Sequence, residues 1–306
     1  MKKNVSQKFG GEVISYSFDS LYEYIDYLDH GVVSPAFRSH QASIDSGSSW
    51  AGTRDYETAR ILCLEGEYSD EFDKFDKKRI ELEKDLVDKI KRARTKADVV
   101  GYAPNVPRYL QGHPLNMFNH MPNPKKARPL VTLNYNITAS SYESAENLRN
   151  RGICTLALIK DLETRGFRVN LNLIESSYCN DQTLLCKWKL KEADDPIDYR
   201  KTFFPLVNPS FLRRLYFRLE EITPELSASW NSGYGRPLEA SLTREFFGID
   251  SVNLLINTPS DHGICGKNLK DDYDSFFKSL NVEGAMKKAI ENANNDSEDS
   301  SSKRVK

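Results

Sequence analysis

Apolar and polar positions alternate most clearly between residues 129 and 175. Leu130, Val131, Leu133 and Tyr135 combine a short apolar run with the period of two that is typical of a strand. Between 153 and 162 the apolar residues recur at helical spacing, and from 167 to 173 the alternation returns. Because a helical crossover lets two strands lie parallel, the sequence predicts a βαβ unit. Ligands of open α/β sheets bind beyond the carboxyl ends of such strands.

The same reasoning divides the rest of the chain. A strand and a helix are expected over 12–29, a helix over 54–65, and a long charged helix from 70 to 96. Residues 101–129 contain six prolines and predict a long irregular loop. Strands are expected at 186–191 and 252–257, and helices at 209–221 and 270–290. The fold class predicted is α/β, with a mostly parallel doubly wound sheet, N-terminal helical decoration over 1–100, a core over 130–290 and a disordered tail over 291–306.

Composition narrows the class of protein. The chain has 306 residues and a net charge of −1, so it is no polycation that would coat nucleic acid indiscriminately. It contains no apolar run near the roughly 20 residues that a membrane helix needs, and the basic N-terminus lacks the apolar segment of a signal peptide. Five widely spaced cysteines suggest reduced thiols. We therefore expect a cytoplasmic protein with no membrane association.

Polar residues gather where the first strand of the βαβ unit ends. Asn134, Asn136 and Thr138 stand there in an N-x-N-x-T pattern, followed by Ser140 and Ser141. The order of elements resembles a von Willebrand factor A domain, in which a strand ends in the metal-binding motif D-x-S-x-S. Here Asn134 replaces the carboxylate that a hard divalent cation needs. The resemblance thus implies a Rossmannoid core with a degenerate site and no metal, and the polar residues either contact a ligand or are solvated.

A wider set of short motifs carries a second resemblance. These are W-A-G at 50–52, R-G at 151–152, L-E-x-x-G at 162–166 and NPSFLRRLYFRLEE at 208–221. Together they resemble a family of bacteriophage and mobile-element proteins over most of residues 45–280. That resemblance implies a phage-encoded accessory role, in the host cytoplasm, and little chemistry.

Basic and aromatic residues suggest a nucleic-acid interface. Single-stranded nucleic acid is bound by cations that contact phosphates and by aromatic rings that stack on bases. The candidates are Arg213, Arg214, Arg218, Lys125, Lys126, Arg128, Lys91, Arg92, Arg94, Tyr102 and Tyr109. In the alternative interpretation, Tyr216 or Phe217 packs into the core while the arginines pair with Glu220 and Glu221.

Histidine chemistry offers a weaker candidate. His262 is followed three residues later by Cys265, but neither a nucleophile elbow nor a paired acid surrounds them. The histidines match no standard zinc spacing, and no glycine-rich phosphate loop is present in the sequence. No cofactor is expected.

The sequence therefore favours a non-enzymatic phage accessory factor that binds single-stranded DNA and assists a polymerase or replication partner. The alternative is a von Willebrand A-like adaptor whose loop face, with Thr138 and Ser140, docks a AAA-type ATPase. A hydrolase that uses His262 is the remote third possibility.

Overall fold

The computed structural model describes residues 1–8, 10–67, 70–87, 96–100, 103–119, 128–250, 252–266 and 268–302. The main sheet contains β1 (Lys2–Lys8), β2 (Gly11–Phe18), β6 (Leu130–Asn136), β7 (Arg168–Cys179), β8 (Gln182–Lys191), β9 (Arg236–Pro237) and β10 (Leu254–Ile256). The longer helices are α1 (Leu21–His30), α4 (Tyr56–Glu65), α5 (Asp70–Val87), α7 (Ala145–Thr164), α8 (Tyr199–Val207), α10 (Ala240–Phe247), α11 (Leu269–Ser279) and α12 (Val282–Ser302). The short helical segments are η1 (Pro35–Phe37), α2 (Ala42–Asp45), α3 (Ser48–Ala51), η2 (Phe211–Tyr216), α9 (Phe217–Glu221), η3 (Ala228–Ser232) and η4 (Ser260–His262).

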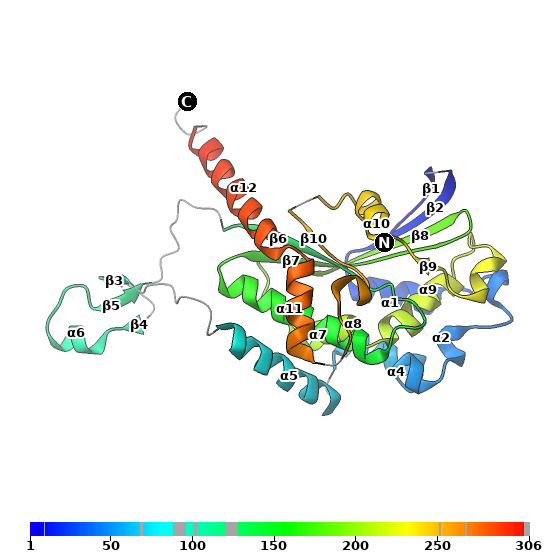
Figure 1. Cartoon of the computed structure of the whole chain (residues 1–306), viewed down its shortest axis with the longest axis horizontal. Helices are drawn as coiled ribbons and strands as arrows, with labels where there is room; N and C mark the ends of the chain where they lie inside the picture. The colour runs from blue at the N-terminus through cyan, green and yellow to red at the C-terminus, as the bar shows by residue number, and fades with distance from the viewer. Residues whose placement is uncertain are drawn as a thin grey trace.

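The main sheet is mixed, in the order β1-β2-β8-β7-β6-β10, with β9 beside β7 (Figure 1). The pairs β2/β8, β6/β7 and β6/β10 are parallel, whereas β1/β2, β7/β8 and β7/β9 are antiparallel. The prediction of a mostly parallel doubly wound sheet is therefore wrong.

Two tight hairpins account for the difference. Gly10 lies in the turn between β1 and β2 with φ 80°, and Asn180 lies in the turn between β7 and β8 with φ 55°. Glycine and asparagine are the residues that most readily adopt this left-handed conformation, which two-residue hairpin turns require. Each hairpin forces its two strands to run antiparallel, and β1 itself was not foreseen.

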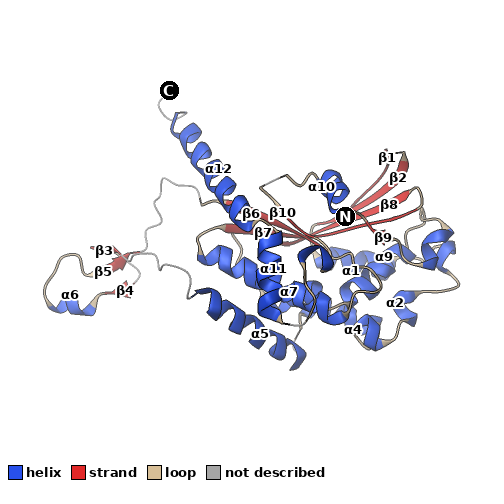
Figure 2. Cartoon of the chain, in the orientation of Figure 1, coloured by secondary structure: helices blue, strands red, loops and turns tan. Residues whose placement is uncertain are grey.

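The core lies mainly between one face of the sheet and the helices. Figure 2 shows most of the labelled helices gathered on one side of the strands, with α10 on the other. Phe18, Leu133, Leu173 and Trp188 are fully buried on the helical side. On the opposite face Phe247 and its neighbours in α10 pack over a smaller set of apolar side chains, among them Val13, Leu185, Ile174 and Leu255. The period of two in these strands therefore separates two packing surfaces.

The predicted βαβ unit is confirmed. Strands β6 and β7 are parallel, with Leu133 opposite Leu171, and α7 connects them. Ser144 caps α7 by accepting a hydrogen bond from the Asn147 amide. Gly152 lets α7 approach α8, because a β-carbon at this position would collide with the Leu206 carbonyl group. The helices predicted near 12–29, 54–65 and 209–221 are also present.

The segment from 70 to 119 differs from its prediction. Helix α5 is described to Val87, but Lys96 begins strand β3 (Lys96–Asp98), so the predicted helix does not reach residue 96. Within the proline-rich segment, β4 (Ala103–Pro104) and β5 (Met117–Asn119) join β3 in a three-stranded sheet of order β3-β5-β4, and helix α6 (Val106–Leu110) lies between β4 and β5 in the chain. Pro104 lies on an edge strand and Pro107 in the first turn of a helix, two positions where a missing N–H is tolerated.

The C-terminal region forms two helices where one was predicted over 270–290. Helix α12 continues to Ser302, although a disordered tail was expected from 291. Its first half is anchored by buried Val282, Ala285 and Ala289, and the helix then extends past the end of the sheet (Figure 1). Among the described helices, none has the length and apolar character needed to cross a bilayer.

Candidate ligand-binding cleft

A cleft of about 880 Å³ opens where the chain leaves the carboxyl end of β6. It is larger than the depressions of about 320 and 280 Å³ elsewhere on the described surface. Its walls come from residues 40–50, from the loop 138–142 that joins β6 to α7, from 212–217 and from residues 231–237. Glu175 and Ser177 of β7 belong to its floor. Segments that are far apart in the sequence therefore build one concavity, at the sheet edge where α/β proteins bind ligands.

One wall is formed by a π-helix, η2. Its wide turn places Leu212, Arg213 and Tyr216 along the cleft, while Arg214 faces the segment 43–54. Helical turns of this type are rare and occur often at functional sites. The amphipathic helix predicted at 209–221 is thus interrupted in the place that lines the cavity.

Arg214 anchors the neighbouring wall. Its side chain is fully buried, and its guanidinium donates hydrogen bonds to the carbonyl oxygens of Ser43, Ser46, Thr53 and Arg54. Burial lowers the pKa of this guanidinium, and Asp55 partly opposes the change. The five donors of arginine suit such a set of carbonyl groups. Arg214 therefore fixes the segment that carries Ser46 and Trp50 into the cleft.

Arg213 lines the cleft and has no carboxylate partner among the described ion pairs. Its Nη1 donates to the Trp50 carbonyl oxygen at 2.6 Å and its Nη2 to the Glu143 carbonyl oxygen at 3.0 Å. The guanidinium carbon lies 4.4 Å from the centre of the Trp50 ring. Burial lowers the pKa of Arg213 to about 10, so the group is a cation at neutral pH. A desolvated cation beside a cavity favours an anionic ligand.

The floor carries a carboxyl group that is mostly protonated at pH 7. Glu175 is 1% exposed, and its Oε1 accepts a hydrogen bond from the Thr138 hydroxyl at 3.1 Å. Its Oε2 is buried and makes no hydrogen bond within the described residues. Burial raises the pKa of Glu175 to about 8, and the hydroxyls of Tyr216, Ser177 and Thr138 only partly offset that effect. No other acidic side chain lines the cleft in the part of the chain described.

The fourth wall holds an aromatic ring in strained backbone. Tyr234 has φ 53°, a conformation that is uncommon for a residue with a large side chain. Its ring stacks on Phe217 at 4.2 Å, and its hydroxyl donates to Glu221 and accepts from the Ala42 amide. Such strain persists where the surroundings fix it, often at ligand clamps. The exposed Arg236 follows at the start of strand β9 and also lines the cleft.

The predicted basic interface is only partly assembled. Arg213 reaches the cleft, Arg214 is an internal anchor, and Arg218 is half-buried, bonded to Gln41 and the Gly31 carbonyl and 3.7 Å from Glu221. Arg214 therefore cannot contact phosphate, which corrects its assignment. Arg128 and Tyr109 are exposed, but neither lines the cleft. Lys91, Arg92, Arg94, Tyr102, Lys125 and Lys126 lie outside the described residues.

The strand-end pattern is an internal hydrogen-bond network. Asn136 donates to Ser176 and Asn257, Asn134 accepts from Asn172, and Thr138 is buried against Glu175. Among the described residues, no three acidic, histidine or cysteine side chains are grouped so that they could hold a metal ion. Only Thr138, Ser140 and Ser141 of the predicted cluster line the cleft.

His262 is a structural residue in this fold. It is buried, its Nε2 accepts from the Asn257 amide at 2.8 Å and its Nδ1 lies 2.8 Å from the Ser279 hydroxyl. Burial lowers the pKa of His262 to about 4, with Arg151 acting in the same direction. Both ring nitrogens are engaged and the ring is neutral at pH 7, so the arrangement offers no nucleophile and base pair.

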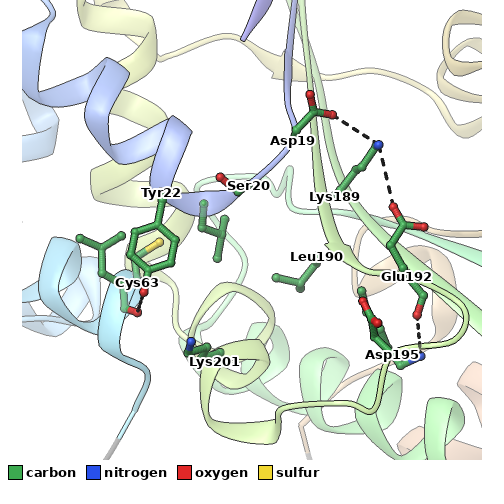
Figure 3. Close-up of a pocket in the computed structure, with 12 residues that line it drawn as sticks. Asp19, Ser20, Tyr22, Cys63, Lys189, Leu190, Glu192, Asp195 and Lys201 are labelled. Atoms are coloured by element: carbon green, nitrogen blue, oxygen red, sulfur yellow. Dashed lines mark hydrogen bonds and ion pairs between the residues drawn. The ribbon is translucent and has the colours of Figure 1, made fainter.

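A smaller depression of about 280 Å³ lies between α1, α4 and the end of β8 (Figure 3). Lys189 there is 3.4 Å from Asp19 and 3.8 Å from Glu192. Tyr22 donates a long hydrogen bond to the Leu64 carbonyl oxygen across its rim. Its charges neutralise one another, in contrast to the cleft, whose cations have no such partners in its lining.

Sequence reasoning missed Trp50, Glu175 and Tyr234 as site residues. Trp50 belongs to the W-A-G motif noted in the sequence, but that motif alone indicates no role in ligand binding. The signal for Glu175 was its position: it is a lone acid among apolar and small polar residues of a buried strand. Its meaning depends on Tyr216 and Thr138, which only the fold brings beside it.

Comparison with known proteins identifies a family for this chain. No curated protein and no solved structure matches the chain. The family model described as "Domain of unknown function (DUF7192)" matches residues 2–284 and makes no connection to bacteriophage proteins or von Willebrand A domains, so those resemblances stay predictions. Because the match spans most of the sequence, the chain belongs to this DUF7192 family.

Proposed function

We propose that this protein binds single-stranded nucleic acid and holds one of its nucleotides in the cleft. The observation that carries the proposal is Arg213, a desolvated cation that faces the cavity without a carboxylate partner among the described ion pairs. Arg236 adds a second cation, and Glu175 adds little negative charge at neutral pH. A phosphate would supply the missing anion.

The other walls suit the remaining parts of a nucleotide. Trp50 and Phe217 present aromatic surface, and the exposed Tyr142 lies at the rim. Bases stack on such rings only when they are unpaired. A concavity of about 880 Å³ is within the range of small-molecule sites and would hold one or two nucleotides, whereas a duplex would not enter it. The serine hydroxyls at 140 and 141 can donate to phosphate or sugar oxygens.

Fluorescence anisotropy with a labelled oligothymidine and a labelled duplex tests the proposal. We expect the single strand to bind more tightly and its affinity to fall as salt rises. Arg236→Glu should weaken binding several-fold. Lys160→Glu makes the same change of charge at an exposed position of α7 outside the cleft, and should bind like the unmodified protein. Absence of binding at micromolar protein in low salt, or equal losses for both variants, would overturn the proposal.

The other sequence-based functions receive less support. The adaptor hypothesis relies on Thr138 and Ser140, and Thr138 is buried with its hydroxyl engaged. A polymerase, replication protein or AAA-type ATPase as partner, a phage origin and a cytoplasmic location stay predictions from the sequence.

A further inference from the structure

Two buried carboxyl groups lie beneath the cleft. Glu175 projects from β7 toward the helices, and Glu220 approaches from α9. Both are at most 1% exposed. Oε2 of Glu175 and both carboxyl oxygens of Glu220 make no hydrogen bond within the described structure. Ionised carboxylates in this position would each need a cation or several donors.

The groups that face these carboxyls supply no positive charge. Tyr216 of η2 and Ser177 of β7 lie between them, with the two hydroxyls 3.1 Å apart. Cys186 of β8 and Tyr24 of α1 complete the electrostatic surroundings, and burial raises the pKa of both well above the ordinary value. Burial likewise raises the pKa of Glu220 well above its ordinary value, and the charges of Glu175 and Glu221 add to that effect. Of the two carboxyl groups, Glu175 lines the cleft and Glu220 does not.

We propose that Glu175 is a specificity-determining residue of the cleft: with its proton it leaves the floor uncharged and admits an anionic nucleotide, and without its proton it excludes that ligand. The inference rests on the proposed function. In addition, the same cavity distinguishes anionic from neutral ligands according to whether Glu175 carries its proton.

The expected size follows from the fraction of protein that holds the proton. With a pKa of about 8, most Glu175 is protonated at pH 6.5 and about a tenth at pH 9. If only the protonated form binds, the apparent Kd at pH 9 is about tenfold higher than at pH 6.5. Glutamine has nearly the same shape and cannot ionise, so Glu175→Gln should lose this dependence.

The experiment measures anisotropy of a labelled oligothymidine at constant ionic strength from pH 6.5 to pH 9. The unmodified protein should lose about tenfold in affinity, and Glu175→Gln should stay within twofold. Glu220→Gln removes a neighbouring buried carboxyl outside the cleft lining and should keep the original profile. Failure of the unmodified protein to bind at pH 6.5 overturns the proposed function and this inference together. Binding with one common pH profile in all three proteins overturns this inference alone.

A second measurement, made on the unmodified protein, tests the inference even if Glu175→Gln does not fold. Oligothymidine with methylphosphonate linkages has an uncharged backbone but the same bases. Its affinity for the unmodified protein should be independent of pH over this range, so the preference for the phosphodiester strand should fall about tenfold by pH 9. A preference that does not change with pH would show that ionisation of Glu175 does not select the ligand.

Discussion

The guanidinium of Arg213 lies over the indole of Trp50 at 4.4 Å and donates a 2.6 Å hydrogen bond to the carbonyl oxygen of the same residue. One arginine thus holds both the ring and the backbone of the residue that forms a wall of the cleft. Trp188 and Trp230 are fully buried, whereas Trp50 is only half-buried. Trp50 is therefore the tryptophan whose fluorescence can report on the cleft.

A strand that stacks in the cleft should protect Trp50. We expect oligothymidine to reduce quenching of the protein's fluorescence by acrylamide, because the bound base covers the exposed ring. Trp50→Phe should abolish this change while keeping an aromatic surface for binding. If the ligand-dependent change survived in Trp50→Phe, the ligand would lie elsewhere.

Arg214→Met should destabilise the protein by about 3 kcal/mol or more, since it leaves buried carbonyl groups without donors. Arg214→Lys keeps the charge but not the fork of donors, and should also be clearly destabilised. Urea unfolding followed by circular dichroism measures both. Stability within about 0.5 kcal/mol of the unmodified protein would show that the segment 43–54 does not depend on this anchor.

Gly152→Ala tests the contact between α7 and α8. Alanine favours a helix by about 1 kcal/mol over glycine, so helix propensity alone predicts a more stable protein. The collision with the Leu206 carbonyl group predicts the opposite, a loss of about 1–3 kcal/mol. Thermal unfolding decides between them, with Lys160→Ala as the exposed control on the same helix. A raised Tm would contradict the close approach of the two helices.

His262 should make the protein sensitive to acid. Its pKa is about 4 in the folded protein and near 6.5 when unfolded, so the unfolded chain binds more protons between these values. Stability is therefore complete above about pH 6.5 and falls as the pH decreases toward 4. His262→Asn should be less stable at pH 7, because the ring's hydrogen bonds are lost, but less dependent on pH from 6.5 to 4. Unchanged pH dependence in thermal unfolding would argue against a neutral buried imidazole.

Glu175 should act in the opposite direction. Its pKa rises from about 4.5 in the unfolded chain to about 8 in the folded protein, so the folded state binds more protons in this range. Its contribution to stability is complete below about pH 4.5 and is lost as the pH rises to 8. Glu175→Gln should therefore become more stable relative to the unmodified protein between pH 6 and pH 8.5. This comparison needs no ligand, and a constant difference across that range would contradict a protonated Glu175.

The parts of the fold that followed from the sequence are those set by local periodicity. The crossover from β6 through α7 to β7 could be predicted because apolar residues recur with a period of two in the strands, as at Leu133 and Leu171. They recur at helical spacing around Leu156. Apolar periodicity does not show whether neighbouring strands run parallel or antiparallel. Their direction depends on turns as short as Asn180–Asp181, which a survey of apolar periodicity passes over.

The candidate site was less predictable, for a physical reason. Arginines 213 and 214 are adjacent in a basic, aromatic helix, and nothing local distinguishes them. The π-turn sends one to the cleft and the other to the carbonyl groups of residues 43–54. Burial likewise changes Glu175 from an ordinary acid into a neutral group, and burial is a property of the whole fold.

The anchoring of residues 43–54 by Arg214 also sets the order in which binding can arise during synthesis. The wall emerges early from the ribosome, but the guanidinium that fixes it comes some 160 residues later, and the loop with Tyr234 later still. A nascent chain that ends before residue 214 contains Trp50 but lacks the arginine that fixes the segment around it. The cleft is thus a late product of chain growth, and truncated copies should not compete with the complete protein for its ligand.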